Sequence, residues 1–111
     1  MNGEKNLKVA LLLDYYGGLL TEKQRDVIDL YYNEDLSLGE IAEQESITRQ
    51  GVRDSIKRGE QTLFELEETL GIAGRSAELL RVAEFLEASA DEDGTGDKMR
   101  MAAADIRRIL E

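Results

Sequence analysis

The chain has 111 residues, a formal net charge of −10, and no cysteine, histidine or proline. Without cysteine and histidine it cannot form disulfides, thiolate zinc sites or the Cys–His and Ser–His pairs of many nucleophilic enzymes. Helix-forming residues dominate and β-branched residues are sparse, so we expect an all-α protein. The length fits one domain, or one domain with a helical extension.

Apolar runs in the sequence are short. The longest is Val9 to Leu13, far below the ~20 residues that a membrane span needs. The chain does not open with the charged, apolar and small-residue regions of a signal peptide. We therefore expect a cytoplasmic protein that does not contact a membrane.

Two helices are expected before residue 35. Residues 7–16 are apolar over most of the helix circumference, which predicts burial on several sides or cover by a partner subunit. Gly17 and Gly18 should end this helix. Thr21 and Gln24 then have the spacing of a capping box, so a second helix should start there and continue to the loop at residues 33–35.

The stretch from Ser37 to Arg58 predicts two short helices joined by a tight turn. Ser37 and Glu40 form a second capping-box pattern, and Thr48 is placed to cap the next helix eleven residues later. Ser46 falls where the chain must turn. This is the spacing of a helix-turn-helix unit, in which the second helix presents its first turns to a nucleic-acid groove.

The second helix of this unit has an apolar and a polar side. At about 100° per residue, Val52 and Ile56 point toward the core. The opposite side carries groups that can bind bases and phosphates, because Arg pairs with guanine, Gln with adenine and Lys with phosphate. The candidate nucleic-acid-binding residues are Thr48, Arg49, Gln50, Arg53, Lys57 and Arg58. The alternative is that they are ordinary solvated residues of an amphipathic helix.

The net positive charge of this helix is local. Thr48 to Arg58 holds four basic residues and one acidic residue, whereas residues 60–111 hold 13 acidic and 6 basic residues. Neutralising three or four phosphates gives only modest, salt-sensitive binding. Useful DNA affinity would therefore need two copies, so we expect a homodimer, or the partner is another molecule.

The same helix should continue well past the basic residues. Apolar positions recur at spacings of three and four up to a stop at Gly71. They are Val52, Ile56, Gly59, Leu63, Leu66 and Leu70. This seam could form the core, a dimer interface or both. Gly59, which has no side chain, should let another helix approach closely.

Two more helices are expected after residue 71. Ser76 can cap the first, after a loop at residues 71–74, and the last should span about Lys98 to Leu110. We therefore expect a helix-turn-helix domain over residues 1–70 and a helical C-terminal extension over residues 71–111. The extension should fold back on the long helix or onto a second subunit.

The loop between these last helices is acidic. Asp91, Asp93, Thr95 and Asp97 stand at positions 1, 3, 5 and 7 of a calcium-binding loop. Position 12, which supplies a bidentate Glu in such loops, is Ala102. A solvated acidic linker is favoured over a calcium site, and we expect no cofactor or metal.

Several sequence elements resemble known proteins. Residues 20–58, with elements LTEKQ, LYY, SLGEIAE and TRQGV, resemble the region-four helix-turn-helix of bacterial sigma factors. Together with LLLDYYGGLLTEKQ before them, they are similar to the YlxM family. Glu45 and Gly51 depart from the pattern, which usually has a large apolar residue and an alanine there. An unpaired buried Glu would be costly, so Glu45 should be exposed or paired and the turn should be somewhat loosened.

Two functional hypotheses follow. Members of the YlxM family are small proteins encoded beside components of the signal recognition particle. The resemblance therefore implies a non-enzymatic regulator of that pathway. Either the helix-turn-helix or the acidic C-terminal half would bind a protein or RNA component of the particle. The residues alone also fit a dimeric DNA-binding transcription regulator that reads half-sites ~34 Å apart. An enzyme is disfavoured, because no acid cluster or phosphate-binding loop converges with a nucleophile.

Overall fold

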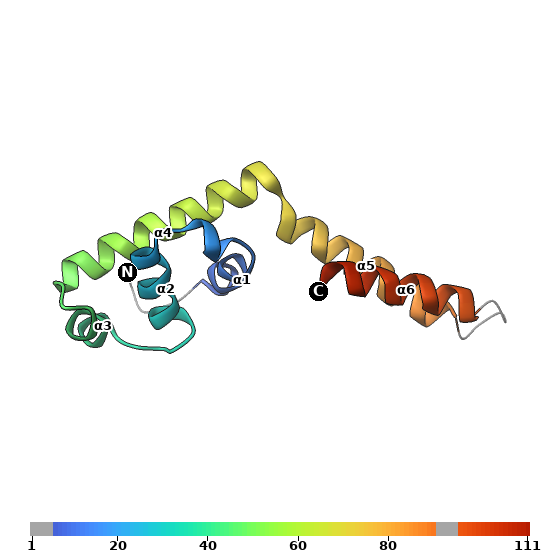
Figure 1. The fold of residues 1–111 in the computed structure, drawn as a ribbon, viewed down its shortest axis with the longest axis horizontal. Coiled ribbons are helices and arrows are strands. Elements are labelled where there is room, and N and C mark those ends of the chain that lie inside the picture. The colour runs from blue at the N-terminus through green and yellow to red at the C-terminus, as the bar shows by residue number, and fades with distance from the viewer. Residues whose placement is uncertain (1–5, 91–95) are drawn as a thin grey trace. The chain divides into compact units, whose positions relative to one another are not determined.

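The computed structural model describes residues 6–90 and 96–111, and all regular elements in these ranges are helical (Figure 1). The elements are α1 (Leu7–Tyr16), the short 3-10 helix η1 (Gly17–Leu19), α2 (Glu22–Tyr32), α3 (Leu38–Glu45), α4 (Arg49–Leu70), α5 (Ile72–Ser89) and α6 (Gly96–Leu110). The predicted all-α fold is confirmed. The chain divides into two compact units, Met1–Gly71 and Ile72–Glu111. None of the described helices could cross a membrane.

The predicted capping boxes are present at two helix starts. The Thr21 hydroxyl accepts a hydrogen bond from the Gln24 N–H at 3.2 Å, and the Gln24 side chain accepts one from the Thr21 N–H. Ser37 and Glu40 make the equivalent pair at 3.1 and 3.0 Å. Because the Glu40 carboxylate accepts the Ser37 N–H, its pKa is lowered. Local sequence therefore fixes where α2 and α3 begin.

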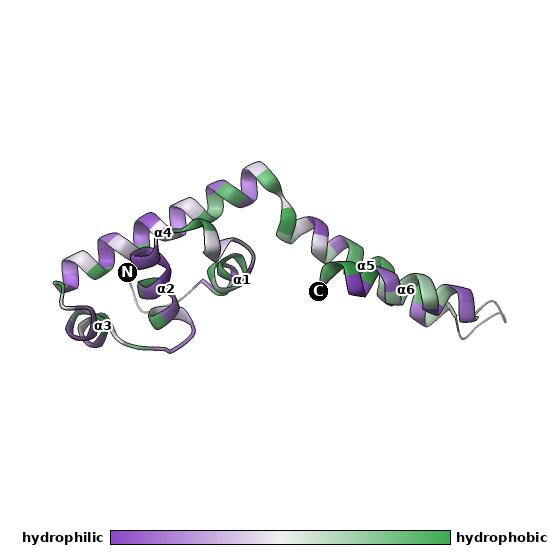
Figure 2. Cartoon of the chain, viewed as in Figure 1, coloured by the Kyte–Doolittle hydropathy of each residue, from purple (hydrophilic) through white to green (hydrophobic). Residues whose placement is uncertain are grey.

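The core of the first unit lies where α1, α2 and α3 pack against one side of α4. Figure 2 shows hydrophobic and hydrophilic residues alternating along α4, as expected for a helix buried along one side. The side chains that are almost completely buried are Val9, Leu12, Tyr16, Val27, Ile28, Ile41, Val52, Ile56 and Leu63.

Gly59 is a point of close packing between α2 and α4. The residue is buried, and a Cβ added to it would overlap Cδ1 of Ile28, which is fully buried on α2. The predicted close approach of another helix at Gly59 is therefore confirmed. Along the rest of the seam Leu63 is buried, Leu66 is half-buried and Leu70 is exposed.

Two tyrosine hydroxyls attach α1 and α2 to the second half of α4. The Tyr16 hydroxyl donates to the Glu67 carboxylate at 2.5 Å, and the Tyr32 hydroxyl donates to Glu60 at 2.6 Å. Burial and the hydrogen bond to Glu60 raise the pKa of Tyr32, so its hydroxyl stays protonated and remains a donor. The two glutamates lie seven residues apart and so share one side of α4.

Helix α1 is covered along only one side within the first unit. Val9, Leu12 and Tyr16 are buried, but Leu7 is 83% exposed and Leu11 is 48% exposed. The prediction that α1 is buried on several sides is therefore wrong for this unit taken alone. Cover by a partner subunit stays a prediction.

The turn between α3 and α4 depends on Ser46. Its backbone is left-handed, with φ 57° and ψ 43°. The Ser46 N–H donates to the Glu43 carbonyl, and the Ile47 N–H donates to the Ala42 carbonyl at 3.0 Å. This is the Schellman arrangement, in which glycine usually occupies the left-handed position. Ser46 therefore holds the turn at some cost in backbone strain.

The second unit is a hairpin of α5 and α6, in which α6 runs back along α5 (Figure 1). Ala83 and Ala103 are fully buried. Arg107 forms an ion pair with Glu87 at 2.5 Å, which raises the pKa of Arg107. Both side chains are about two-fifths exposed, so the pair adds little stability.

Two predicted boundaries in the second unit are corrected. The predicted loop at residues 71–74 is wrong, because α5 begins at Ile72, directly after Gly71. Gly71 is left-handed (φ 63°), and a single residue in that conformation is enough to end α4. Helix α6 begins at Gly96 rather than Lys98. The possible calcium loop at Asp91–Asp97 falls largely on residues 91–95, outside the described residues.

Replacing Gly59 with alanine should destabilise the first unit. The gain in helix propensity is about 1 kcal/mol. The cost of overpacking against Ile28 should exceed this gain, so the free energy of unfolding should fall by about 1–2 kcal/mol. All four tyrosines lie in this unit, so tyrosine fluorescence during urea unfolding reports on it. Gly18→Ala is the control, because its added Cβ meets no atom within 4 Å. Adding Ile28→Val, which removes the overlapping Cδ1, should recover part of the loss.

Replacing Ser46 with glycine should stabilise the same unit by about 0.5–1 kcal/mol. Glycine removes the left-handed strain, although it also adds entropy to the unfolded chain. Ser46→Ala removes the hydroxyl but keeps the Cβ, so it should give no gain. Urea unfolding followed by tyrosine fluorescence measures both changes. Equal stabilisation by alanine and glycine would contradict the strain argument.

Candidate nucleic-acid interface

The predicted recognition helix is α4, and Thr48 sets its start. The Thr48 hydroxyl accepts a hydrogen bond from the Gly51 N–H at 2.9 Å, as expected of a helix cap. A Cβ added to Gly51 would lie 3.2 Å from that hydroxyl oxygen. Glycine therefore gives the cap room, and α4 continues through this position without interruption.

Three predicted site residues project from α4 into solvent. Arg53, Lys57 and Arg58 are all exposed, while Val52 and Ile56 beside them are fully buried. Within residues 6–90 and 96–111, the side chains of these three residues make no hydrogen bond or ion pair. Their charges are therefore available to a partner. We call these three residues the basic face of α4.

Two other predicted site residues are engaged within the protein. The guanidinium of Arg49 lies over Gly39 on α3, where an added Cβ would come within 2.9 Å of it. The Gln50 side-chain amide donates to the Asp54 carboxylate at 3.0 Å. To read bases, Arg49 would have to leave α3, and Gln50 would have to leave Asp54.

Asp54 lies between the basic residues on the outward side of α4. It lines one shallow hollow with Lys57, Arg58 and Gln61. At about 100° per residue, Asp54 is almost opposite the buried Val52 and Ile56 side. A carboxylate there opposes the approach of phosphate and limits how strongly the basic face can bind nucleic acid.

A second groove joins the basic face to the start of α2. Its lining residues are Thr21, Lys23, Gln24, Gly51, Asp54, Ser55 and Arg58. Lys23 and Arg58 bring positive charge, and Thr21 and Ser55 bring hydroxyls, so the groove has groups suited to a phosphate backbone. Lys23 was not predicted from the sequence, because no local pattern links it to residues more than thirty positions away.

Charges along α4 run against the helix dipole. Arg49 lies in the first turn and Glu67 and Glu68 in the last, and the helix has no acidic residue in its first turn and no basic one in its last. Each such placement costs about 0.3–1 kcal/mol at exposed positions. This pattern does not stabilise α4 by itself, so the helix depends on its packing against α1, α2 and α3.

Glu45 just precedes the turn between α3 and α4, and it is half-buried. No charged or polar residue in the described part of the chain is fully buried. The expectation that Glu45 is exposed or paired is therefore met only in part, because Glu45 is half-buried and has no hydrogen bond or ion pair among the described residues. The expected loosening of the turn is wrong. Because the turn keeps its Schellman hydrogen bonds, the departure at this position does not disrupt the helix-turn-helix geometry.

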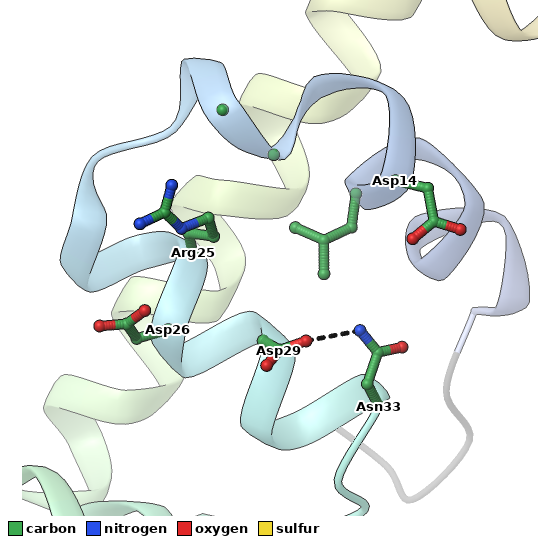
Figure 3. Close-up of a pocket in the computed structure, with 8 residues that line it drawn as sticks. Asp14, Arg25, Asp26, Asp29 and Asn33 are labelled. Carbon is green, nitrogen blue, oxygen red and sulfur yellow. Dashed lines mark hydrogen bonds between the residues drawn. The ribbon is translucent and has the colours of Figure 1, made fainter. Parts of the chain in front are cut away.

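An acidic hollow lies between α1 and α2 (Figure 3), and no residue of the basic face lines it. Asp14, Asp26 and Asp29 line it with Arg25, and Asp29 accepts a hydrogen bond from the Asn33 amide at 2.6 Å. Among the described residues, no three carboxylate, cysteine or histidine side chains gather closely enough to hold a metal ion. The hollow therefore does not compete with α4 as the candidate site.

Comparison with known proteins agrees with this geometry. A family model described as "UPF0122: Putative helix-turn-helix protein, YlxM / p13 like" matches residues 3–101. A UPF0122 protein of Desulforamulus reducens is 47% identical over 109 residues, covering 94% of this chain and 92% of its own. Another, from Acetivibrio thermocellus, is 46% identical over 115 residues, covering 97% and 98%.

A third UPF0122 protein, from Bacillus cereus, is 40% identical over 107 residues and covers 96% of this chain and 97% of its own. These relatives match along nearly their full lengths, so the similarity extends over both units. The chain with the capped helix-turn-helix at α3 and α4 therefore belongs to the UPF0122 family of YlxM/p13-like helix-turn-helix proteins.

Proposed function

We propose that this protein is a non-enzymatic regulator that binds a component of the signal recognition particle through the basic face of α4. The observation that carries the proposal is the exposure of Arg53, Lys57 and Arg58 on a capped recognition helix, with no side-chain partner among the described residues. The link to the particle rests on the similarity to the YlxM family. Residues 1–70 would be the binding domain.

An RNA component is the partner that best fits the charges. The basic face and Lys23 can contact only a few phosphates, while the whole chain carries a formal charge of −10. A small basic site on an acidic protein favours a partner whose shape concentrates phosphates near it over uniform coating of nucleic acid. Thr48, Arg49 and Gln50 would complete the contact once Arg49 leaves Gly39 and Gln50 leaves Asp54.

A dimeric DNA-binding transcription regulator is the second candidate. The helix-turn-helix geometry favours it, because α4 presents its first turns outward as DNA-reading helices do. Two copies would double the few phosphate contacts of one α4. Their recognition helices would have to enter successive major grooves, ~34 Å apart.

Removing charge from the basic face should weaken binding to the particle's RNA. We expect Arg53→Ala/Lys57→Ala to lower affinity about 10- to 100-fold near 0.1 M salt, and to reduce the salt slope by between about one and two. The control, Arg25→Ala/Arg81→Ala, removes equal charge from exposed residues elsewhere and should change affinity less than about threefold. Fluorescence anisotropy with labelled particle RNA, unrelated RNA and duplex DNA measures these changes.

The binding measurements distinguish RNA, DNA and protein as the partner. Preference for the particle's RNA supports the first function, and preference for duplex DNA supports the second. Retention of a particle protein from nuclease-treated lysate, lost in Arg53→Ala/Lys57→Ala, would identify a protein partner. Equal binding by this variant and the control would rule out the basic face as the site.

Asp54→Asn should tighten binding. Asparagine keeps an oxygen that can accept the hydrogen bond from Gln50, but it removes the negative charge between Lys57 and Arg58. A carboxylate about 6 Å from a phosphate in a solvated interface costs roughly 0.7 kcal/mol, so affinity should rise about threefold or more. The same anisotropy titration tests this, with Glu65→Gln, farther along α4, as the control. Weaker binding by Asp54→Asn would mean that the carboxylate itself contacts the partner.

A further inference from the structure

The α5–α6 hairpin leaves its large apolar side chains uncovered. Its fully buried residues include the small Ala83 and Ala103, whereas Val82 is 48% exposed and Ile109 is 77% exposed. Two helices alone cannot enclose a core of large side chains, so the alanines set the contact between them. The large side chains are left for another surface.

Six of the apolar side chains lie on one side of the hairpin, three of them exposed and three half-buried, whereas Phe85 and Met101 are exposed elsewhere. Relative to Ala83, the residues Leu79, Val82 and Leu86 lie four before, one before and three after it. Relative to Ala103, Met99 lies four residues before and Ile106 three after, as Leu79 and Leu86 do relative to Ala83. Ile109, six residues after Ala103, lies on the same side of α6. In two antiparallel helices, equal rotations from the contact line bring residues to the same side of the pair. We call these six residues the hairpin face.

We propose that the hairpin face packs against the hairpin face of a second copy, forming a four-helix bundle that joins two protomers. A two-fold symmetric interface pairs one patch with itself, which a flat apolar face bordered by both charge signs allows. Arg75 and Glu78 border it on α5, and Lys98 and Asp105 border it on α6. Residues 72–111 carry nine acidic and six basic side chains, a net charge of −3, so the repulsion between two copies of this unit is small and is screened by salt.

The area available on this side of the hairpin lies at the lower limit for a specific pair. Helices of 18 and 15 residues are about 27 and 22 Å long, and adjacent axes lie about 8–10 Å apart. One hairpin face thus covers roughly 450 Å², and two facing copies bury on the order of 1,000 Å² in total. This reaches the lower limit of specific interfaces.

The inference rests on the homodimer in the proposed function and names its surface. It does not depend on what α4 binds, so the test is read without nucleic acid. A dimer that binds no nucleic acid and no protein of the particle would overturn the proposed function and leave the hairpin interface. A monomer that binds RNA through α4 would do the reverse.

Sedimentation equilibrium of the full chain tests the interface. Wild type should be a dimer, and Val82→Glu/Ile109→Glu should raise the dimer dissociation constant at least ~100-fold, because it buries four unpaired charges. Phe85→Glu/Met101→Glu is the matched control. It adds equal charge at residues that are 69% and 68% exposed and point away from the hairpin face, so it should have less than about a threefold effect.

Other outcomes would overturn the proposal. One is a wild-type protein that stays monomeric up to ~100 µM. Another is equal weakening of the dimer by the Val82→Glu/Ile109→Glu variant and by the control variant. A third is loss of the dimer only in Leu7→Glu/Leu11→Glu, which would place the interface on the exposed side of α1.

Because the chain has no cysteine, a thiol can serve as a second reporter. The thiol of the Val82→Cys variant should be alkylated at least ~10-fold more slowly once the protein concentration exceeds the dimer dissociation constant. The alkylation rate of the Phe85→Cys variant should not depend on protein concentration.

Discussion

The close packing of α2 against α4 at Gly59 is the constraint on which the first unit depends. Ile28 occupies the space that a side chain at residue 59 would need, and both residues are buried. This contact lies between Val52 and Ile56 on one side and Leu63 on the other, so it aligns the whole buried side of α4. Because a helix has about 3.6 residues per turn, fixing that side also fixes the direction of Arg53, Lys57 and Arg58.

Helix α4 combines two electrostatic roles along its length. Its first half carries the basic residues of the interface, and its second half carries Glu60, Glu65, Glu67 and Glu68 without a basic residue after Arg58. Two of these glutamates accept hydrogen bonds from Tyr16 and Tyr32. The acidic half thus helps to attach α1 and α2, while the basic half stays free for a partner. The unfavourable order with respect to the helix dipole is offset by tertiary packing.

The two units bury their apolar side chains to different extents. The first unit surrounds α4 with three helices and buries large side chains such as Leu12, Ile56 and Leu63. The second has only two helices, buries alanines and exposes large side chains, as half of a larger assembly would. Under the two proposals, binding belongs to the first unit and self-association to the second.

The sequence by itself determined the elements whose signals are local. Side chains at Thr21, Ser37 and Thr48 cap their own helices within three residues, and the period of the apolar residues separates the buried side of α4 from its basic side. These signals predicted the helix-turn-helix and the Arg53 and Lys57 positions. The start of α5 was mispredicted, because Gly74 and Ser76 resemble a loop and a cap but are tolerated inside a helix.

Tertiary structure alone decided which predicted site residues are free. Arg49 and Arg53 look alike in sequence, yet only Arg49 meets Gly39, because α3 crosses near the start of α4. Lys23 joins Arg58 in one groove because α2 packs against α4. The tertiary structure also leaves Leu7, Val82 and Ile109 exposed. Apolar spacing shows that a side chain can be buried, but whether it is buried depends on which distant helix covers it.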